Sequence, residues 1–358
     1  LIHDLKPTGL TTASAVDVQH SLANLVAEGA GAAVMEVSSH GLDQGRVSSV
    51  DFDTAVFTNL SQDHLDYHGT MESYSEAKSK LFETEGLKSA VINLDDDFGR
   101  VLAEKYRGQL TVYGYSTTAD IGALESCADF IIYAKSLKAT KRGFEINVVT
   151  PKGNGYFELD LMGSFNVSNA LAVLATLLLN NVAFDESINR LQAITPVAGR
   201  MELIVAENKP AVIVDYAHTP QGIAAACNAV KQHFSAGLWC VFGCGGDRDR
   251  EKRPLMAQAV ERYADHIIVT SDNPRHEDPR LIIEQIVNGL AEPDAAVTYV
   301  DRREAIAHAV AHATPDEVIL IAGKGHESCQ IVGDKYIVFD DRDVARALLD
   351  ARDTGVNG

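Results

Sequence analysis

Short apolar runs rich in β-branched residues alternate with segments of helical periodicity along most of this 358-residue chain. This alternation is the sequence feature that most constrains the fold, because it is typical of buried parallel strands joined by crossover helices. We therefore predict an α/β fold with parallel sheets. The length also predicts two domains, since a single hydrophobic core stops growing at roughly 250–300 residues.

The first half of the chain combines two strand patterns. Strand-like runs occur at Ala32–Ser38, Thr54–Leu60, Ala90–Leu94 and Thr111–Tyr115, and the first three of them end in polar residues. Between residues 128 and 162 the strands are closely spaced, as at Gly143–Thr150 and Tyr156–Leu161, with Gly and Pro turns that predict an antiparallel appendage. A long apolar helix is predicted at Asn166–Leu179.

The second half begins where the periodicity breaks, at a stretch with Pro and Gly between Ile194 and Gly199. We place the domain boundary near residue 198, which gives domains of residues 1–197 and 198–358. Strands are predicted at Ala211–Asp215, Leu238–Phe242, His266–Thr270, Ala296–Val300 and Val318–Ala322. The helices predicted between them include Gln221–His233, Pro254–Ala264 and Arg280–Leu290.

Composition excludes some classes of function. A net charge of −19 argues against a duplex-binding surface, which needs clustered Lys and Arg, but it permits anionic small substrates in a local Arg pocket. The five cysteines show no paired CxxC spacing, which favours reduced thiols in a cytoplasmic protein. No segment approaches the apolar length that crosses a bilayer, so no membrane insertion is expected.

Polar clusters in the first half follow predicted strands, where open α/β sheets bind ligands. In Glu36-Val-Ser-Ser-His-Gly41 the carboxylate can hold a divalent cation, although a Ser-rich capping loop is the alternative. In Asp63-His-Leu-Asp-Tyr-His68, the side chains of His64 and His68 would share one face of a helix. This second motif fits a zinc site, a hard-cation site shared with Glu36, or a solvated histidine pair, and the sequence leaves all three open.

The segment Ala77-Lys-Ser-Lys-Leu-Phe82 carries two lysines, Lys78 and Lys80. Two lysines on an acidic protein are usually part of a solvated helix face. A desolvated lysine near a metal can instead be neutral enough to react with carbon dioxide and form a carbamate ligand. Both interpretations remain open.

Three polar clusters follow predicted strands of the second half. Gly243-Cys-Gly-Gly-Asp-Arg-Asp249 offers a tight turn, amides that attract an anion, and the guanidinium of Arg248 for a carboxylate. Asp272-Asn-Pro-Arg275 adds a second guanidinium, and Gly323-Lys-Gly-His-Glu327 adds a carboxylate for an ammonium group. Together they suit a ligand with two carboxylates and amines, although each motif taken singly could be an ordinary turn. The sequence contains no phosphate loop of the form GxxxxGK followed by Ser or Thr.

In order along nearly the whole chain, these clusters resemble the Mur ligase family. Further segments that carry the resemblance are Leu10-Thr-Thr-Ala-Ser-Ala-Val-Asp-Val-Gln19, Thr58-Asn-Leu-Ser61, Gly163-Ser-Phe-Asn-Val-Ser-Asn169, Gly199-Arg-Met-Glu202 and Val214-Asp-Tyr-Ala-His-Thr-Pro220. The family has a UDP-binding domain, a central ATPase domain and a C-terminal amino-acid-binding domain. The resemblance implies that this chain holds an incomplete central ATPase domain followed by a Rossmann-like C-terminal ligase domain. The phosphate loop and the UDP-binding domain are expected upstream of Leu10, and the chain by itself is expected not to hydrolyse ATP.

The resemblance also assigns roles to residues. Contacts to a UDP-sugar dipeptide fall on Thr11, Thr12, Ser38, Gln44 and Arg46. Magnesium ligands fall on Glu36 and His64, with Lys78 as a carbamylated catalytic lysine that also ligates the metal. Contacts to ATP fall on Asn166 and Asn169 near the adenine, and on Arg200 and Asp215 near the phosphates and ribose. The diaminopimelate pocket comprises Arg248, Asp272, Asn273, Pro274, Arg275, Gly323 and Glu327.

The activity that the resemblance implies is ATP- and Mg²⁺-dependent ligation of meso-2,6-diaminopimelate to UDP-N-acetylmuramoyl-L-alanyl-D-glutamate through an acyl phosphate, by a cytoplasmic monomer. This reaction belongs to peptidoglycan precursor synthesis, and no nucleic-acid partner is expected. Arg275 would pair with the distal carboxylate that distinguishes diaminopimelate from lysine. Three alternatives remain: a folylpolyglutamate synthase or another Mur ligase, a metal-dependent hydrolase built on Glu36, His64 and His68, and a non-catalytic remnant that binds diaminopimelate.

Overall fold

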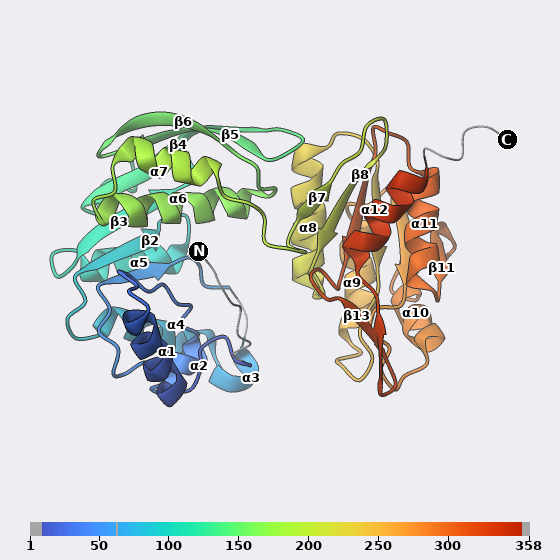
Figure 1. Cartoon of the computed structure of the whole chain (residues 1–358), viewed down its shortest axis with the longest axis horizontal. Helices are drawn as coiled ribbons and strands as arrows, with labels where there is room; N and C mark the ends of the chain where they lie inside the picture. Colours follow the sequence, from blue (N-terminus) through green and yellow to red (C-terminus); the bar gives the residue numbers. More distant parts are fainter. Residues whose placement is uncertain (1–8, 62–63, 353–358) are drawn as a thin grey trace. The chain divides into compact units, whose positions relative to one another are not determined.

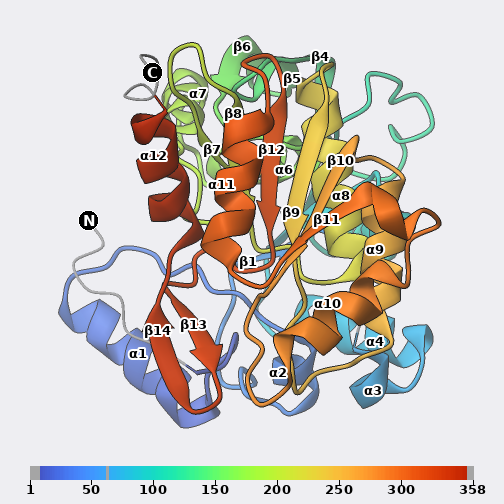
Figure 2. The same ribbon diagram turned by 90° about the vertical axis from the view of Figure 1, so that its right-hand side faces the viewer.

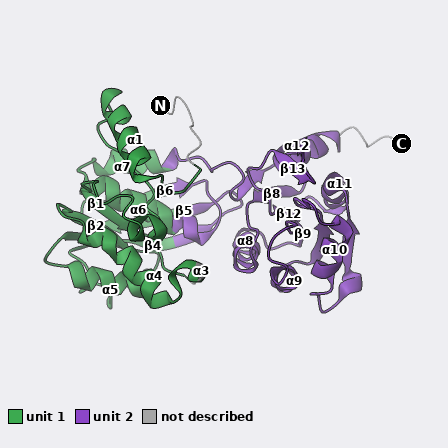
Figure 3. Ribbon diagram, turned by 90° about the horizontal axis from the view of Figure 1, so that it is seen from below, with its two compact units in different colours: residues 1–136, 146–157, 168–191 green, residues 137–145, 158–167, 192–358 purple. Residues whose placement is uncertain are grey.

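The computed structural model describes residues 9–61 and 64–352, so Asp63 of the predicted histidine motif lies outside the described residues. The chain forms two compact units (Figure 3). Unit 1 comprises residues 1–136, 146–157 and 168–191, and unit 2 comprises residues 137–145, 158–167 and 192–358. The division into functional domains near residue 198 stays a prediction.

A six-stranded sheet organises the first half of the chain, in the order β1-β2-β3-β4-β5-β6 (Figure 1). Its strands are β1 Thr54–Phe57, β2 Ser89–Asn93, β3 Thr111–Ser116, β4 Phe130–Ala139, β5 Phe144–Thr150 and β6 Gly153–Leu159. The pairs from β1 to β4 are parallel, as the alternation of strands and helices predicts. The helices of this half are α1 Ala15–Ala27, α2 Ser39–Asp43, α3 Leu65–His68, α4 Met71–Ser79, the 3-10 helix η1 Lys80–Glu83, α5 Asp97–Tyr106, α6 Ser164–Leu179 and α7 Phe184–Gln192.

The strand predicted at Ala32–Ser38 is wrong, because residues 32–38 form no strand in the structure. An apolar run becomes a strand only where a neighbour completes its ladder of hydrogen bonds. None of the six strands pairs with this segment within the described residues, and Val34 is 97% exposed. Periodicity alone cannot show whether such a neighbour exists.

The strands predicted as an antiparallel appendage belong to the same sheet as β1 to β3. β4 pairs in parallel with β3, in a register that sets Phe130 opposite Tyr113, and β5 and β6 extend the same sheet. The Gly-containing turns correctly indicate closely spaced strands, but turn spacing does not show which sheet edge those strands join. The long apolar helix is confirmed as α6.

Unit 2 contains a second six-stranded sheet, in the order β11-β10-β9-β12-β8-β7. Its strands are β7 Glu202–Ile204, β8 Ala211–Asp215, β9 Leu238–Phe242, β10 His266–Thr270, β11 Ala296–Tyr299 and β12 Val318–Ala322, and only β7 is antiparallel to its neighbour. The five predicted strands are confirmed, and four of them have the predicted ends. The helices are α8 Pro220–His233, α9 Lys252–Glu261, α10 Pro279–Val287, the 3-10 helix η2 Pro293–Ala295, α11 Arg302–His312 and α12 Asp341–Ala351. A hairpin is formed by β13 Cys329–Val332 and β14 Lys335–Val338.

Both faces of this second sheet are covered, which explains why its strands are continuous apolar runs. Val212 and Val214 of β8 belong to the core shared with α11 and α12, whereas Ile213 belongs to the core shared with α8, α9 and α10. This alternation follows the two-residue period of a strand. Figure 1 shows α8 on one side of β8 and α11 on the other.

Capping side chains fix where the helices of unit 2 begin. Thr219 accepts the N–H of Gly222 at 3.1 Å ahead of α8, and Asp301 accepts the N–H of Arg303 at 2.7 Å ahead of α11. Such caps are each worth about 1 kcal/mol. The chain therefore turns from strand ends into helices at defined residues.

The carboxyl ends of β8, β9, β10 and β12 lie at one edge of the sheet, because these strands are parallel. Figure 2 shows the hairpin β13–β14 at the end toward which β9 and β12 point. The five cysteines are free thiols, as predicted, and all but Cys329 are buried. Among the helices that the structure describes, none is both long enough and apolar enough to span a bilayer.

Candidate functional site

The loop after β10 carries four residues predicted to bind ligand, Asp272, Asn273, Pro274 and Arg275, of which the first three are buried. Oδ1 of Asp272 accepts the backbone N–H of Asn273 at 2.7 Å. The carbonyl of Asp272 accepts Nε2–H of Gln330 at 2.6 Å. These bonds hold the loop against the β13 strand of the hairpin.

The loop after β12 approaches the same place through Gly323. This residue has a φ of +119°, a backbone conformation that favours glycine. A Cβ atom here would lie 2.6 Å from Oδ2 of Asp272, so a side chain would force the two loops apart. The structure thus brings the ends of β10 and β12 together, as their positions in a parallel sheet predict.

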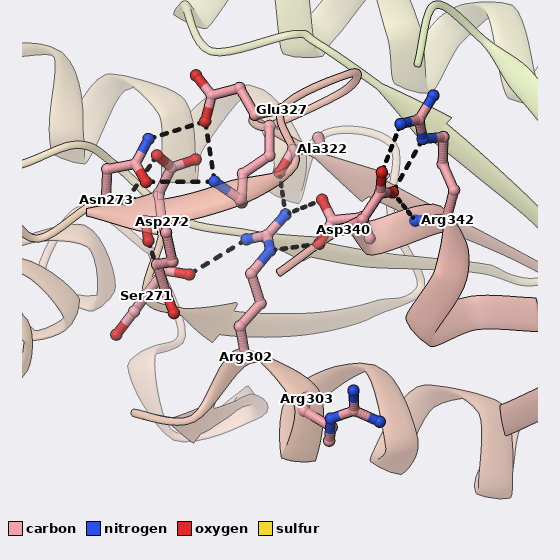
Figure 4. Close-up of polar contacts among 12 residues, drawn as sticks. Ser271, Asp272, Asn273, Arg302, Arg303, Ala322, Glu327, Asp340 and Arg342 are labelled. Carbon is pink, nitrogen blue, oxygen red and sulfur yellow. Dashed lines mark hydrogen bonds and ion pairs between the residues drawn. The ribbon is translucent and has the colours of Figure 1, made fainter. Parts of the chain in front are cut away.

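Asn273, Lys324 and Glu327 form a polar triangle between these two loops. Nδ2 of Asn273 and Nζ of Lys324 both donate to Oε2 of Glu327, each at 2.8 Å, and Nζ also donates to Oδ1 of Asn273 at 3.2 Å. Figure 4 shows Asn273 and Glu327 facing one another. Burial acts to raise the pKa of Glu327, but the hydrogen bonds from Lys324 and Asn273 outweigh it and lower that pKa. Glu327 is therefore an ionised carboxylate that can bind an ammonium group.

Arg275 is held in an unusual backbone conformation, with a φ of +50° that is costly for a residue other than glycine. Its N–H donates to the carbonyl of Ile331 at 3.0 Å, and its carbonyl accepts the N–H of Gly333 at 2.7 Å. Nη1 of its half-buried guanidinium donates to the carbonyl of Gly246 at 2.8 Å. That bond uses one of five guanidinium N–H groups, so the group can still bind a carboxylate.

The glycine-rich loop after β9 packs directly on Arg275. A Cβ atom on Gly245 would lie 2.8 Å from Nη1 of Arg275, and one on Gly246 would collide with the carbonyl of Pro274. Arg248 lies on this neighbouring loop with an exposed side chain, and its Nη1 donates to the carbonyl of Asp247 at 3.3 Å. The glycines are therefore required for close approach of the loops.

An ion pair between Arg253 and Glu277 stabilises this glycine-rich loop, and it was not predicted from the sequence. The fully buried Arg253 donates to both carboxylate oxygens of Glu277, at 2.8 and 3.1 Å, and to the carbonyl of Gly245 at 3.4 Å. The hydrogen bonds from Arg253 are the main reason why the pKa of Glu277 is lowered to about 2. The start of α9 is thereby tied to the loop that follows Arg275.

A second buried ion pair, Arg302 with Asp341, was also missed by sequence reasoning. Nε and Nη2 of Arg302 donate to the two carboxylate oxygens of Asp341 at 2.7 and 2.8 Å, and both side chains are fully buried. The guanidinium also donates to the carbonyls of Ala322 at 3.0 Å and Ser271 at 3.3 Å (Figure 4). Arg302 therefore joins the ends of β10 and β12 to the starts of α11 and α12.

Arg200 and Asp215, which the resemblance assigns to ATP, lie near each other in unit 2. Oδ1 and Oδ2 of Asp215 accept the backbone N–H groups of Ala217 at 2.9 Å and Met201 at 2.8 Å. The exposed guanidinium of Arg200 lies over the ring of Tyr216, 4.6 Å from its centroid. Asp215 thus fixes the backbone that positions Arg200.

In unit 1, the predicted dipeptide-binding residues Thr12, Ser38, Gln44 and Arg46 come together. Oγ1 of Thr12 accepts the N–H of Ser38 at 2.8 Å and donates to the carbonyl of Glu36 at 3.1 Å. Arg46 donates from Nη1 to the carbonyl of Thr12 at 2.8 Å and from Nε to Oε1 of Gln44 at 2.9 Å. These bonds form a polar surface around the predicted Glu36 motif.

The histidine motif is arranged differently from the prediction. His64 precedes α3 and has a φ of +54°, so only His68 of the two lies within a helix. The ring of His40 lies 5.0 Å from that of His64 and 5.3 Å from that of His68, between centroids. The ring of Tyr74 lies 5.8 Å from His64, and Nζ of Lys78 lies 5.1 Å from the Tyr74 centroid. Tyr74 therefore links the two predicted metal ligands His64 and Lys78.

A metal site in unit 1 depends on Lys78. Within the described residues, no three His, Cys, Asp or Glu side chains are placed to hold a metal, so a zinc hydrolase built on Glu36, His64 and His68 finds no support there. An unmodified lysine is cationic and repels a metal ion. As a carbamate it would provide an anionic oxygen, and this oxygen with the Glu36 carboxylate and the His64 imidazole is a donor set that fits a hard divalent cation.

The remaining predicted contacts are Asn166, Asn169 and Thr11. Asn166 and Asn169 lie in the first two turns of α6, and Nδ2 of Asn166 donates to the carbonyl of Met162 at 2.8 Å. Thr11 is exposed close to Thr12 in sequence.

Comparisons with known proteins agree with this geometry. The family described as "Mur ligase middle domain" matches residues 1–177, and the one described as "Mur ligase, glutamate ligase domain" matches residues 199–325. A Coxiella burnetii protein named UDP-N-acetylmuramoyl-L-alanyl-D-glutamate–2,6-diaminopimelate ligase is 45% identical over 345 residues, which are 96% of this chain and 70% of that protein. A solved structure of a ligase of the same name matches with a TM-score of 0.73 and 38% identity, over 98% of this chain and 71% of that one.

The folylpolyglutamate synthase of Mycobacterium tuberculosis shares the fold alone. Its structure matches with a TM-score of 0.57 and 20% identity, over 87% of this chain and 66% of that one. The similarity to the diaminopimelate-adding ligases is therefore much closer than the similarity to this alternative.

Proposed function

This chain belongs to the Mur ligase family of ATP-dependent ligases, and on this premise we propose that it joins meso-2,6-diaminopimelate to UDP-N-acetylmuramoyl-L-alanyl-D-glutamate. The reaction is a step in peptidoglycan precursor synthesis. The relatives that carry this activity in their names match over nearly the whole of this chain. A cytoplasmic location and a monomeric state remain predictions.

The observation that carries the proposal is a cation on the loop after β10 and an anion on the loop after β12, two loops that the structure brings together. Arg275 offers a half-buried guanidinium, and Glu327 offers an ionised carboxylate. Diaminopimelate has an ammonium and a carboxylate at each end, and its distal end, which corresponds to the side-chain end of lysine, would occupy this pair of charges. The distal end of lysine has an ammonium alone and would leave Arg275 without a carboxylate.

The chemistry follows from which end is bound. The side-chain carboxylate of the D-glutamate residue is activated as an acyl phosphate, and a neutral amine of diaminopimelate attacks its carbonyl carbon and displaces phosphate. An ammonium paired with Glu327 keeps its proton and cannot attack. Glu327 and Arg275 would therefore hold the end that does not react, while the other end reaches the acyl phosphate.

ATP and magnesium would be held by the residues that the resemblance assigns. ATP supplies the phosphoryl group, and a divalent cation offsets the charge that gathers between phosphates and carboxylate. Glu36, His64 and carbamylated Lys78 would hold the cation. Arg200, positioned by Asp215, would meet the phosphates, with Asn166 and Asn169 beside the adenine. Thr11, Thr12, Ser38, Gln44 and Arg46 would bind the UDP-sugar dipeptide.

Isothermal calorimetry of this chain with meso-diaminopimelate and with L-lysine tests the proposal. The distal carboxylate adds hydrogen bonds to a charged partner worth about 1.5–3 kcal/mol. We therefore expect diaminopimelate to bind roughly 10- to 150-fold more tightly than lysine. Equal affinities, or no binding of either amino acid, would contradict the proposed substrate.

A non-catalytic protein that only binds diaminopimelate would pass this calorimetric test. The polar surface around Thr12, Ser38 and Arg46 favours the ligase over that alternative, because a protein that only binds the amino acid has no use for a second binding surface in unit 1. Binding of UDP-N-acetylmuramoyl-L-alanyl-D-glutamate to this chain, measured in the same way, separates the two.

A further inference from the structure

Lys324 carries a charge that the proposed reaction does not use. Its side chain is 0% exposed, although an ammonium is costly to remove from water. Nζ donates to Oε2 of Glu327 at 2.8 Å, to Oδ1 of Asn273 at 3.2 Å and to the carbonyl of Cys329 at 2.6 Å. An ammonium has three N–H groups, so these three bonds satisfy it completely.

The three bonds also fix the orientation of both neighbouring side chains. Oδ1 of Asn273 accepts from Lys324 and from the backbone N–H of Ile331 at 3.0 Å, which leaves Nδ2 to point at Glu327. Oε2 of Glu327 accepts from both Lys324 and Asn273. Both hydrogen bonds that Glu327 accepts within this triangle therefore end on Oε2, while the Glu327 side chain is 31% exposed.

We propose that Lys324 is a positioning residue of the diaminopimelate pocket, which holds Oε2 of Glu327 so that Oε1 is presented to the ammonium of the bound amino acid. The inference rests on the proposed function and adds to it a residue that does not itself touch substrate. A carboxylate fixed in advance loses less side-chain entropy when the ligand binds, and that gain raises affinity.

Lys324 also keeps Glu327 ionised. Without Lys324, burial of the carboxyl would favour its neutral form. The other charged groups around Glu327 are Arg302, whose guanidinium is influenced by both Asp272 and Glu327, and His326, which lowers the pKa of Glu327. Arg302 and His326 remain when Lys324 is replaced, so a comparison with the unaltered chain isolates the contribution of Lys324.

A role limited to folding gives a different expectation. The bond from Lys324 to the carbonyl of Cys329 closes the turn between β12 and β13. If that were its whole purpose, replacing Lys324 would lower stability and affinity equally at every pH. Loss of the charge next to Glu327 instead makes the defect grow as the solution becomes more acidic.

The test is calorimetry of Lys324→Met and of the unaltered chain, with meso-diaminopimelate and with L-lysine, at pH 7.5, 6.5 and 5.5. Both ligands have the ammonium that Glu327 binds, so we expect both to bind about tenfold more weakly to the variant at pH 7.5. For each ligand, the affinity of the unaltered chain divided by the affinity of the variant should increase several-fold between pH 7.5 and pH 5.5. Lys335→Met, at an exposed lysine of β14, is the matched control and should bind like the unaltered chain.

Equal affinities of the unaltered chain and Lys324→Met, or a ratio of these affinities that stays constant with pH, would overturn the positioning role. The substrate assignment would remain intact. Failure of the unaltered chain to bind diaminopimelate would overturn the proposed function and this inference with it. Should Lys324→Met fail to fold, the ¹³C shift of the Glu327 carboxyl in the unaltered chain, assigned with Glu327→Gln, decides the matter. A midpoint below about 4.3 supports the inference, and one at or above that ordinary value overturns it.

Discussion

Replacing Asp341 by asparagine is expected to lower the free energy of unfolding by about 3–5 kcal/mol. The asparagine has nearly the same size but no charge, so it leaves the fully buried guanidinium of Arg302 without its counter-ion. Domains are stable by only about 5–15 kcal/mol, so this is a large part of the total. Urea unfolding followed by circular dichroism measures the change.

Two companion variants show whether the loss comes from an uncompensated charge. Asp343 pairs with Arg346 at 3.4 Å on the same helix, with side chains 78% and 49% exposed, and Asp343→Asn should cost no more than about 1 kcal/mol. The double variant Arg302→Met with Asp341→Leu removes both charges and should recover much of the stability that Asp341→Asn loses. A cost for Asp341→Asn as small as that for Asp343→Asn would show that the buried pair does not brace the strand ends.

Replacing Arg275 by methionine is expected to abolish the preference for diaminopimelate over lysine. The affinity for diaminopimelate should fall roughly 10- to 150-fold, which corresponds to about 1.5–3 kcal/mol for hydrogen bonds to a charged group. The affinity for lysine should change little or rise, because lysine has no distal carboxylate and the half-buried cation is removed. Calorimetry with both ligands gives the two values.

The matched control is Arg280→Met, at an exposed arginine of α10 in the same unit. It removes the same charge without altering the pocket, so both affinities should stay as they are. Thermal unfolding of both variants checks that neither substitution destabilises the fold. An Arg275→Met chain that still prefers diaminopimelate would show that another residue recognises the distal carboxylate.

The sheet of unit 2 was predictable because its strands are buried on both faces. Ala211–Asp215, Leu238–Phe242 and Val318–Ala322 are continuous apolar runs, and each ends where polar residues begin. Asp272 and Gly323 follow β10 and β12, which are separated by β9, and their position at the same end of the sheet then follows from parallel pairing. Ala32–Ser38 is also a mostly apolar run, but no strand pairs with it in the part of the chain that the structure describes, so the pattern predicted a strand wrongly there.

The side-chain pairing within the site could not be predicted. Arg302 pairs with Asp341, which lies 39 residues further along the chain. Nothing in the sequence distinguishes Arg302 from the adjacent Arg303, which is exposed. Lys324 is likewise one of 31 lysines and arginines, and only the folded loops show that it is buried under Glu327. Burial and pairing of charges depend on tertiary contacts, whereas strand positions depend on local periodicity.

A crystal structure of this chain with meso-diaminopimelate bound tests the central claim most directly. The account predicts that the guanidinium of Arg275 meets the carboxylate of one end of the ligand at hydrogen-bond distance, with Oε1 of Glu327 on the ammonium of that same end. A ligand seated with that carboxylate in solvent, or against a cation other than Arg275, would contradict it.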